Sequence, residues 1–267
     1  MPTVTEVLDL ATGVRVPYLE SGDPDGVPLV VLHGYSDSAL SNAPLLAALP
    51  RSIHAFALTA RGHGDASRPA GGYTPSDMAA DVAAFADARG LGPIVVVGHS
   101  MGSYAAQAFA VEHPDRTRAV ILLGAFRTFG GNADNAGLLD DVEKLTDPVD
   151  EAFVREFQLS TLAHRVPDEY LEMVIAESRK MPAAVLQRVM RDLCAADPPT
   201  HGGRIEAPLL AIWGDRDAFA PRADQDRLVR EAADARLVVY EGSGHAMHWE
   251  DPERVAADIA AFVEALR

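Results

Sequence analysis

The stretch Pro93–His113, PIVVVGHSMGSYAAQAFAVEH, decides the fold of this chain. It opens with the apolar, β-branched run Ile94–Val97, which is typical of a strand buried on both faces. It closes with Ser103–Val111, an alanine-rich run without a helix breaker, which predicts a helix. Between them, Gly98–Gly102 (GHSMG) places a serine between two glycines. The stretch therefore predicts a strand, a sharp turn and a helix, with the serine at the turn.

The serine of this turn, Ser100, is a candidate nucleophile. A strand that reverses sharply into a helix crowds its own backbone, so residues without a Cβ are needed two positions before and after the turning residue. The turning residue is pushed outward at the head of the helix, where free N–H groups and the helix dipole favour negative charge. The bare pattern also occurs as a plain glycine–serine turn, but its strand and helix context favours the nucleophile.

Length and composition indicate an ordinary globular protein. The chain has 267 residues, of which 48% are hydrophobic and 23% charged, so it fits one large α/β domain or one domain with an insertion. The formal net charge is −16, the only lysines are Lys144 and Lys180, and the arginines are scattered. We therefore expect no nucleic-acid partner, and we interpret the acidity as favouring solubility.

Cysteine usage and hydropathy bound the compartment. Cys194 is the only cysteine, so neither an intrachain disulfide nor a cysteine-based metal cluster is expected. The N-terminal MPTVTEVLDL lacks the features of a secretory signal, and no segment reaches the ~18 uninterrupted apolar residues of a membrane helix. These patterns predict a soluble cytoplasmic protein without a membrane partner, and they leave the oligomeric state open.

Short apolar runs alternate with helical segments along most of the chain. The expected strands are 14–19 (an edge strand), 28–32, 53–58, 94–97, 119–123, 208–213 and 236–240. The expected helices of this part are 40–49, 74–89, 103–111, 222–233 and 252–266. The alternation predicts an α/β fold with a mostly parallel central sheet of about eight strands and helices on both faces.

The alternation fails between residues 125 and 203. Only helices are expected there, over residues 150–162, 167–179 and 183–195. We therefore predict a core domain formed by 1–124 and 204–267, with 125–203 as a helical lid (cap) inserted over one end of the sheet.

A serine hydroxyl needs a base, and the base works best when a third group holds its tautomer. In a parallel sheet such groups should follow strands directly, at the carboxyl end. Two loops that follow expected strands carry suitable residues, Trp213–Asp217 and Glu241–His245. They offer Asp215 or Asp217 as the carboxylate and His245 as the base.

Five motifs, taken together, resemble the α/β-hydrolase family and its serine-nucleophile, esterase-like branch. They are GHSMG, the His33-Gly34 loop, the RGHG of residues 61–64, the G-x-x-D-x-x-x-P of Gly214–Pro221 and the GSGH of residues 242–245. They occur in the order found in the family and span essentially the whole chain.

This resemblance implies a role for each matching residue. Ser100 would be the nucleophile, His245 the general base and acid, and Asp217 the orienting carboxylate. The backbone N–H groups of Met101 and Tyr35 would form the oxyanion hole.

Alternatives remain for several of these residues. Asp215 could replace Asp217, although a capping or turn role suits it better, and His248 could replace His245, although its neighbours suggest packing. The two histidines could suggest a metal, but no third ligand matches them, so no metal site is expected. His33 and His99 flank the site and are expected to hydrogen-bond the surrounding loops.

A serine at the turn argues against the dehalogenase and epoxide-hydrolase branches, which use aspartate there. It favours attack on a carbonyl and an acyl-serine intermediate, which water then hydrolyses. Neither a dinucleotide-binding nor a P-loop glycine motif is present, so the sequence implies no cofactor.

Substrate choice is expected to depend mainly on the lid. The candidate pocket residues are all apolar, although each could equally pack between helices: Phe126, Phe129, Phe153, Phe157, Leu162 and Met181. They suggest a small or medium uncharged ester or lactone, and a carboxylesterase is the first interpretation. A lactonase, a C–C bond hydrolase or a cofactor-free perhydrolase would share the triad. A slow-turnover small-molecule receptor is the alternative from another class.

Overall fold

The computed structural model describes residues 5–130 and 135–266, and a single eight-stranded sheet lies at its centre. The strands are β1 (Thr5–Asp9), β2 (Arg15–Ser21), β3 (Val27–Leu32), β4 (Ile53–Leu58), β5 (Ile94–His99), β6 (Thr117–Leu123), β7 (Leu209–Gly214) and β8 (Ala235–Tyr240). Their spatial order is β1-β2-β4-β3-β5-β6-β7-β8. β2 runs antiparallel to both of its neighbours and all other pairs are parallel, which confirms the predicted sheet class.

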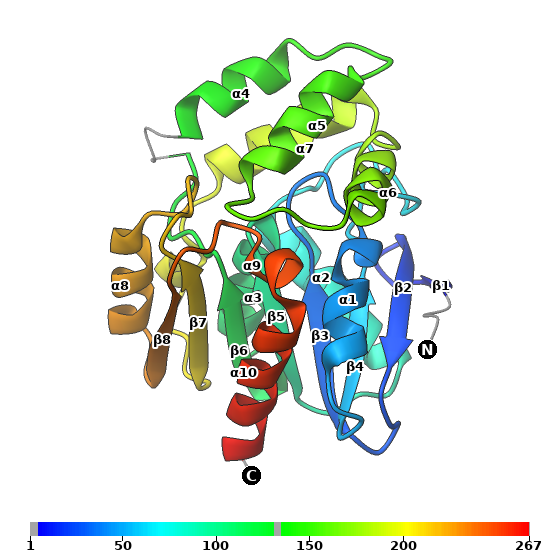
Figure 1. Ribbon diagram of the computed structural model, residues 1–267. Coiled ribbons are helices and arrows are strands. Elements are labelled where there is room, and N and C mark those ends of the chain that lie inside the picture. The colour runs from blue at the N-terminus through cyan, green and yellow to red at the C-terminus, as the bar shows by residue number, and fades with distance from the viewer. Residues whose placement is uncertain (1–4, 131–134, 267) are drawn as a thin grey trace.

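The central strands are buried because helices cover both faces of the sheet (Figure 1). On one face pack α1 (Ala43–Ala48) and α10 (Pro252–Ala265). On the other pack α2 (Pro75–Ala88), α3 (Met101–Glu112) and α8 (Arg222–Glu231). Among the described residues, no helix is both long and apolar enough to cross a membrane.

Strand register aligns the loops that matter for function. β3 pairs with β5 so that Leu32 lies opposite Gly98, and β5 pairs with β6 so that His99 lies opposite Leu123. Because these three strands are parallel, the loops that leave their carboxyl ends start side by side. The serine turn therefore lies between the loop after β3 and the loop after β6.

In the described part of the chain between β6 and β7 lie four α-helices, and Figure 1 shows them together above the carboxyl ends of the strands. They are α4 (Ala136–Glu143), α5 (Glu151–Ser160), α6 (Asp168–Ser178) and α7 (Ala183–Ala195), and we call them the helical insertion. The last three match the expected helices. α4 was not expected, since residues rich in Gly, Asn and Asp precede it. The division into a core and a lid at residues 125 and 203 stays a prediction.

The sheet edge differs from the expectation. The strand expected at the edge, 14–19, corresponds to β2, and β1 pairs outside it. β1 lacks an apolar signal because four of its five residues are exposed. The expected helix 40–49 is also divided, into a 3₁₀ turn (Ala39–Asn42) and the short α1.

Candidate active site

Ser100 sits in a strained turn between β5 and α3. Its backbone is left-handed, with φ 53° and ψ −119°, and its N–H donates to the carbonyl of Leu123 at 3.1 Å. A Cβ at Gly98 would lie 2.2 Å from the carbonyl oxygen of Gly102. A Cβ at Gly102 would lie 2.5 Å from the carbonyl oxygen of Leu32. Neither glycine can therefore carry a side chain without a shift of the surrounding backbone.

A buried carboxylate–imidazole pair lies at the same edge of the sheet. His245 Nδ1 is 2.8 Å from Asp217 Oδ2, and their side chains are 3% and 0% exposed. The other carboxylate oxygen, Oδ1, accepts the backbone N–H groups of Phe219 at 2.8 Å and Ala220 at 2.9 Å. Because a carboxylate only accepts, the pair assigns the proton to Nδ1 of the imidazole. Nε2 is then left as the basic nitrogen.

The two rival residues have other surroundings. Asp215 is exposed, and its Oδ1 accepts the N–H of Gly242 at 2.6 Å, as expected for a turn residue. His248 is buried with its ring centroid 4.3 Å from that of His99. Burial, together with the nearby His245, lowers the pKa of His248 to about 3, so its ring is neutral. The structure thus pairs His245 with Asp217 and not with Asp215.

Two glycines make room for this pair: Gly214, the first residue of the G-x-x-D-x-x-x-P motif, and Gly124, which was not among the predicted site residues. Gly124 directly follows β6 with φ +53°, and a Cβ there would lie 2.9 Å from His245 Nδ1. Gly214 ends β7, and a Cβ there would lie 2.3 Å from the carbonyl oxygen of Ser243. A glycine at the carboxyl end of a parallel strand was the signal available in the sequence.

The loop after β3 is held by a buried histidine. His33 Nε2 accepts the N–H of Ala60 at 2.9 Å, which leaves Nδ1 to donate to the carbonyl of Gly34 at 2.7 Å. Burial lowers the pKa of His33 to about 3, so the ring stays neutral and can accept through Nε2 while it donates through Nδ1. The N–H of Asp37 donates to the same carbonyl at 3.3 Å. Because a trans peptide opposes its C=O and N–H, the N–H of Tyr35 points the other way.

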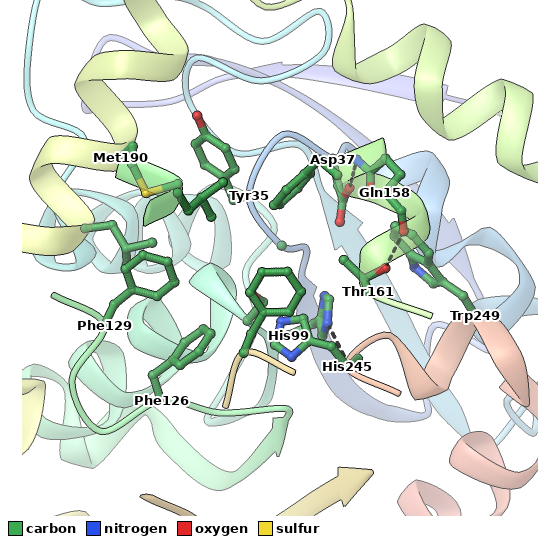
Figure 2. A pocket seen from close by; sticks show the side chains of 16 residues that line it. Tyr35, Asp37, His99, Phe126, Phe129, Gln158, Thr161, Met190, His245 and Trp249 are labelled. Atoms are coloured by element: carbon green, nitrogen blue, oxygen red, sulfur yellow. Dashed lines mark hydrogen bonds between the residues drawn. The ribbon is translucent and has the colours of Figure 1, made fainter. Parts of the chain in front are cut away.

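A cavity opens between these loops and the helical insertion, with about 400 Å³ of space between its walls, part of it open to solvent. Its lining residues are Gly34, Tyr35, Asp37, His99, Ser100, Phe126, Phe129, Leu138, Phe157, Gln158, Thr161, Met190, Leu193, Phe219, His245 and Trp249. Figure 2 shows Phe126, Phe129 and Met190 at one end, Asp37, Gln158, Thr161 and Trp249 at the other, and His99 and His245 between them. The cavity therefore has an apolar end and a polar end on either side of His99 and His245.

The expected pocket residues divide between this cavity and other surroundings. Phe126, Phe129 and Phe157 line it. Met181 does not: it is 1% exposed, packs in the hydrophobic core and borders a separate surface hollow. Phe153 and Leu162 are also absent from the lining.

Three apolar lining residues of the insertion were not foreseen. They are Leu138, on the unexpected α4, and Met190 and Leu193, on α7. The sequence signal for Met190 and Leu193 was helical periodicity, since both share one buried face of α7 with Leu186.

The polar end is built around a buried carboxyl group that the sequence analysis did not consider. Asp37 is 2% exposed, and Gln158 Nε2 of α5 donates to its Oδ1 at 3.1 Å. Burial raises the pKa of Asp37 to about 7, against the opposing effect of hydrogen bonds from Gln158 and the Gly34 backbone. No described lining residue is a lysine or arginine. The cavity thus offers no cation to an anionic group.

Comparison with solved structures gives the same architecture. An esterase from Rhodococcus superposes with a TM-score of 0.85 at 21% sequence identity, covering 98% of this chain and 99% of that one. At this identity the likeness concerns the fold.

Several known proteins of similar sequence are hydrolases. A 2-hydroxy-6-oxononadienedioate/2-hydroxy-6-oxononatrienedioate hydrolase from Burkholderia vietnamiensis is 29% identical, over 96% of this chain and 93% of that protein. A pimeloyl-acyl-carrier-protein methyl ester esterase from Neisseria meningitidis is 27% identical, over 90% of this chain and 95% of that protein. These relatives support an enzyme of the hydrolase type. The model of the alpha/beta hydrolase family matches residues 29–258, and this chain belongs to that family.

Proposed function

We propose that the protein is a serine hydrolase that cleaves a small to medium, uncharged carboxylic ester through an acyl-serine intermediate. One observation carries the proposal: Asp217 and His245 form a buried 2.8 Å hydrogen bond, and His245 and Ser100 line one cavity. Nucleophile, base and orienting carboxylate are the three parts that acyl transfer by serine requires.

In the proposed reaction, His245 Nε2 takes the proton of Ser100 Oγ as this oxygen attacks the ester carbonyl. The resulting oxyanion collapses, the C–O bond to the alcohol breaks, and His245 returns the proton to the departing alkoxide oxygen. Water then attacks the acyl-serine with His245 as base, which releases the acid and restores Ser100. Asp217 holds the imidazole in the required tautomer and stabilises its protonated form.

The oxyanion would be held by the N–H groups of Met101 and Tyr35. Met101 is the first residue of α3, so its N–H lies in the turn that has no intrahelical acceptor. The peptide that carries the Tyr35 N–H is oriented through the carbonyl of Gly34, which His33 and Asp37 hold. The close contact of Gly102 with the end of β3 supports this assignment, because it packs the turn after β5 against the start of the loop that carries Tyr35.

The walls of the cavity favour an uncharged ester. The substrate of the Burkholderia relative is, by its name, a dicarboxylate, whereas no described lining residue here is a lysine or arginine. Asp37, the only carboxyl group among the described lining residues, would repel an anion when ionised. Phenylalanine, leucine and methionine side chains surround the apolar end and suit an alkyl or aryl group.

Turnover of p-nitrophenyl esters from acetate to dodecanoate tests the proposal, and the chain-length profile measures the apolar end. An intact-mass spectrum after exposure to a serine-directed phosphonate locates the nucleophile. We expect turnover, one adduct on Ser100, and a loss of about 10⁵-fold or more in kcat for Ser100→Ala with the fold unchanged.

Other outcomes separate the alternatives. An adduct without ester turnover would point to a receptor or to another scissile bond, which lactone, C–C diketone and peracid assays would then distinguish. More than a few per cent of activity in the Ser100→Ala variant would contradict the nucleophile. Absence of both adduct and turnover would contradict the assembled site.

A further inference from the structure

The polar end of the cavity contains hydrogen-bonding groups that the proposed ester hydrolysis does not use. Asp37 leaves the loop after β3, Gln158 and Thr161 come from the end of α5, and Trp249 comes from the short α9 (Met247–Glu250). Figure 2 shows them together on the side of His245 away from Phe126 and Phe129. Three separate parts of the fold thus contribute polar atoms to one corner.

Two polar atoms, one on Trp249 and one on the neighbouring His99, are buried without a partner among the described residues. Trp249 is 4% exposed, and its Nε1–H has no acceptor. His99 is 2% exposed, and its Nε2 lies 3.2 Å from the carbonyl oxygen of His245, so Nε2 carries the proton and Nδ1 is an acceptor without a donor. Burying a polar atom without a partner is costly, so a substrate group that hydrogen-bonds to these atoms would gain binding energy.

The acceptors of this corner converge. A carbon built on Gly34 would lie 2.9 Å from His99 Nδ1 and 3.1 Å from Asp37 Oδ2, so both atoms lie close to one point next to Gly34, which itself lines the cavity. The other oxygen of Asp37 is already occupied by Gln158 Nε2 at 3.1 Å. The corner therefore offers two neighbouring acceptors, Asp37 Oδ2 and His99 Nδ1, and one donor, Trp249 Nε1–H.

We propose that this corner is a binding subsite for a neutral hydroxyl group of the substrate, placed on the opposite side of the ester carbonyl from its apolar part. A hydroxyl is the small neutral group that both donates and accepts, so it can donate to Asp37 or His99 while it accepts from Trp249. A carboxylate would meet two acceptors, and a methyl group would leave all three atoms unpaired. The inference rests on the proposed ester hydrolysis and narrows its substrate to a hydroxylated ester.

Matched ester pairs test the subsite on both sides of the carbonyl. On the alcohol side, butyl butyrate is compared with 4-hydroxybutyl butyrate. On the acyl side, ethyl hexanoate is compared with ethyl 6-hydroxyhexanoate. We expect kcat/KM to be about tenfold or more higher for the hydroxylated member of at least one pair. Equal values in both pairs, with the plain esters turned over, would overturn the subsite while leaving the proposed function intact.

Variants assign any preference to the corner. In Trp249→Phe and Asp37→Leu, the ratio of kcat/KM between the paired esters should fall to within about threefold of unity. Asp215→Leu is the matched control, because Asp215 is exposed and outside the cavity, and it should keep the wild-type ratio. A ratio unchanged in Trp249→Phe would contradict the assignment, even if Asp37→Leu does not fold.

NMR of the indole N–H groups detects binding at the subsite without turnover. Trp213 and Trp249 are the only tryptophans, and Trp213 Nε1–H already donates to the carbonyl of Ala220 at 2.8 Å. In the Ser100→Ala variant, the hydroxylated ester should move the Trp249 Nε1–H resonance downfield, whereas the plain ester and the Trp213 resonance should show little change. A failure of the proposed function would leave this shift in place, whereas identical shifts with both esters, or no shift, would overturn the subsite.

Discussion

The loops at the carboxyl edge of the sheet and the helical insertion above them build the site by different means. In the loops, the backbone packs too closely for side chains at three glycines. Gly98 and Gly102 leave no space for a Cβ beside neighbouring backbone, and Gly124 leaves just enough space for the ring of His245. In the insertion, side chains such as Phe157 and Met190 face the cavity from helices. We therefore expect the loops to tolerate little change of shape, and the insertion to accept other cavity-lining side chains with little displacement of Ser100 and His245. We infer that the loops set the chemistry and that the insertion selects the substrate.

Among the variants that test this comparison, the largest expected effect on kcat comes from replacing Asp217, the carboxylate that these loops contribute. Asp217→Asn should lower kcat by about 10⁴-fold, because an amide in place of Oδ2 no longer holds the imidazole in the required tautomer. Asp215→Asn is the matched control and should stay within about twofold of the wild type, since it only accepts a turn N–H. Steady-state kinetics with a p-nitrophenyl ester measure both. The reverse order would assign the orienting role to Asp215.

A smaller loss is expected from a single methyl group in the loop after β6. Gly124→Ala forces a Cβ to within 2.9 Å of His245 Nδ1 and strains a backbone with φ +53°, so kcat should fall by about 10²-fold.

Gly137→Ala, in the exposed part of α4 with no atom near its Cβ, is the control and should leave kcat unchanged. If Gly124→Ala keeps full activity, the close packing of this loop is not what positions the histidine.

In the insertion, we expect a change of selectivity rather than of chemistry. Phe157 lines the cavity, with its ring 5.8 Å from that of Tyr35, whereas Phe153, one turn earlier on α5, does not line it. Phe157→Ala should shift the preferred ester chain length and change relative kcat/KM values by about tenfold. Phe153→Ala should leave the profile unchanged. Equal profiles for the two variants would argue against the insertion as the selecting region.

The smallest effect concerns stability and pH. Burial raises the pKa of Asp37 in the folded protein to about 7, from its ordinary value of 3.8. It therefore binds its proton more tightly when folded, and the free energy of unfolding falls as pH rises from about 4 to about 7.

Asp37→Asn removes this titration. The variant should be more stable than the wild type at pH 8, by up to about 4 kcal/mol, and the difference should shrink toward pH 5. Urea unfolding at both pH values measures it. A difference that does not depend on pH would contradict the raised pKa.

The strand–turn–helix unit and the loops after β7 and β8 were predictable because their signals are local. Each of these signals lies within a few residues of sequence: a β-branched run, two glycines around Ser100, and polar residues directly after the strands. Helical periodicity likewise predicted α5, α6 and α7, because each buries one face.

The remaining features depend on contacts between residues that lie far apart in the chain. β1 is mostly exposed and is held in the sheet by its pairing with β2, so no apolar pattern in the sequence predicts it. Met181 has the apolar character expected of a pocket residue, yet it packs in the core. The fold alone brings Asp37 and Trp249 together in the polar corner. In the sequence, a tryptophan indicates packing rather than a hydrogen-bond donor.

The most direct test of the account is to trap the covalent intermediate. Wild-type protein is mixed with p-nitrophenyl butyrate, quenched in acid within the first turnover and digested for peptide mass spectrometry. The account predicts a burst of p-nitrophenol and one butyryl group on the peptide that contains Ser100, with neither in the Ser100→Ala variant. Continued turnover with the acyl group on another residue, or in the Ser100→Ala variant, would contradict it.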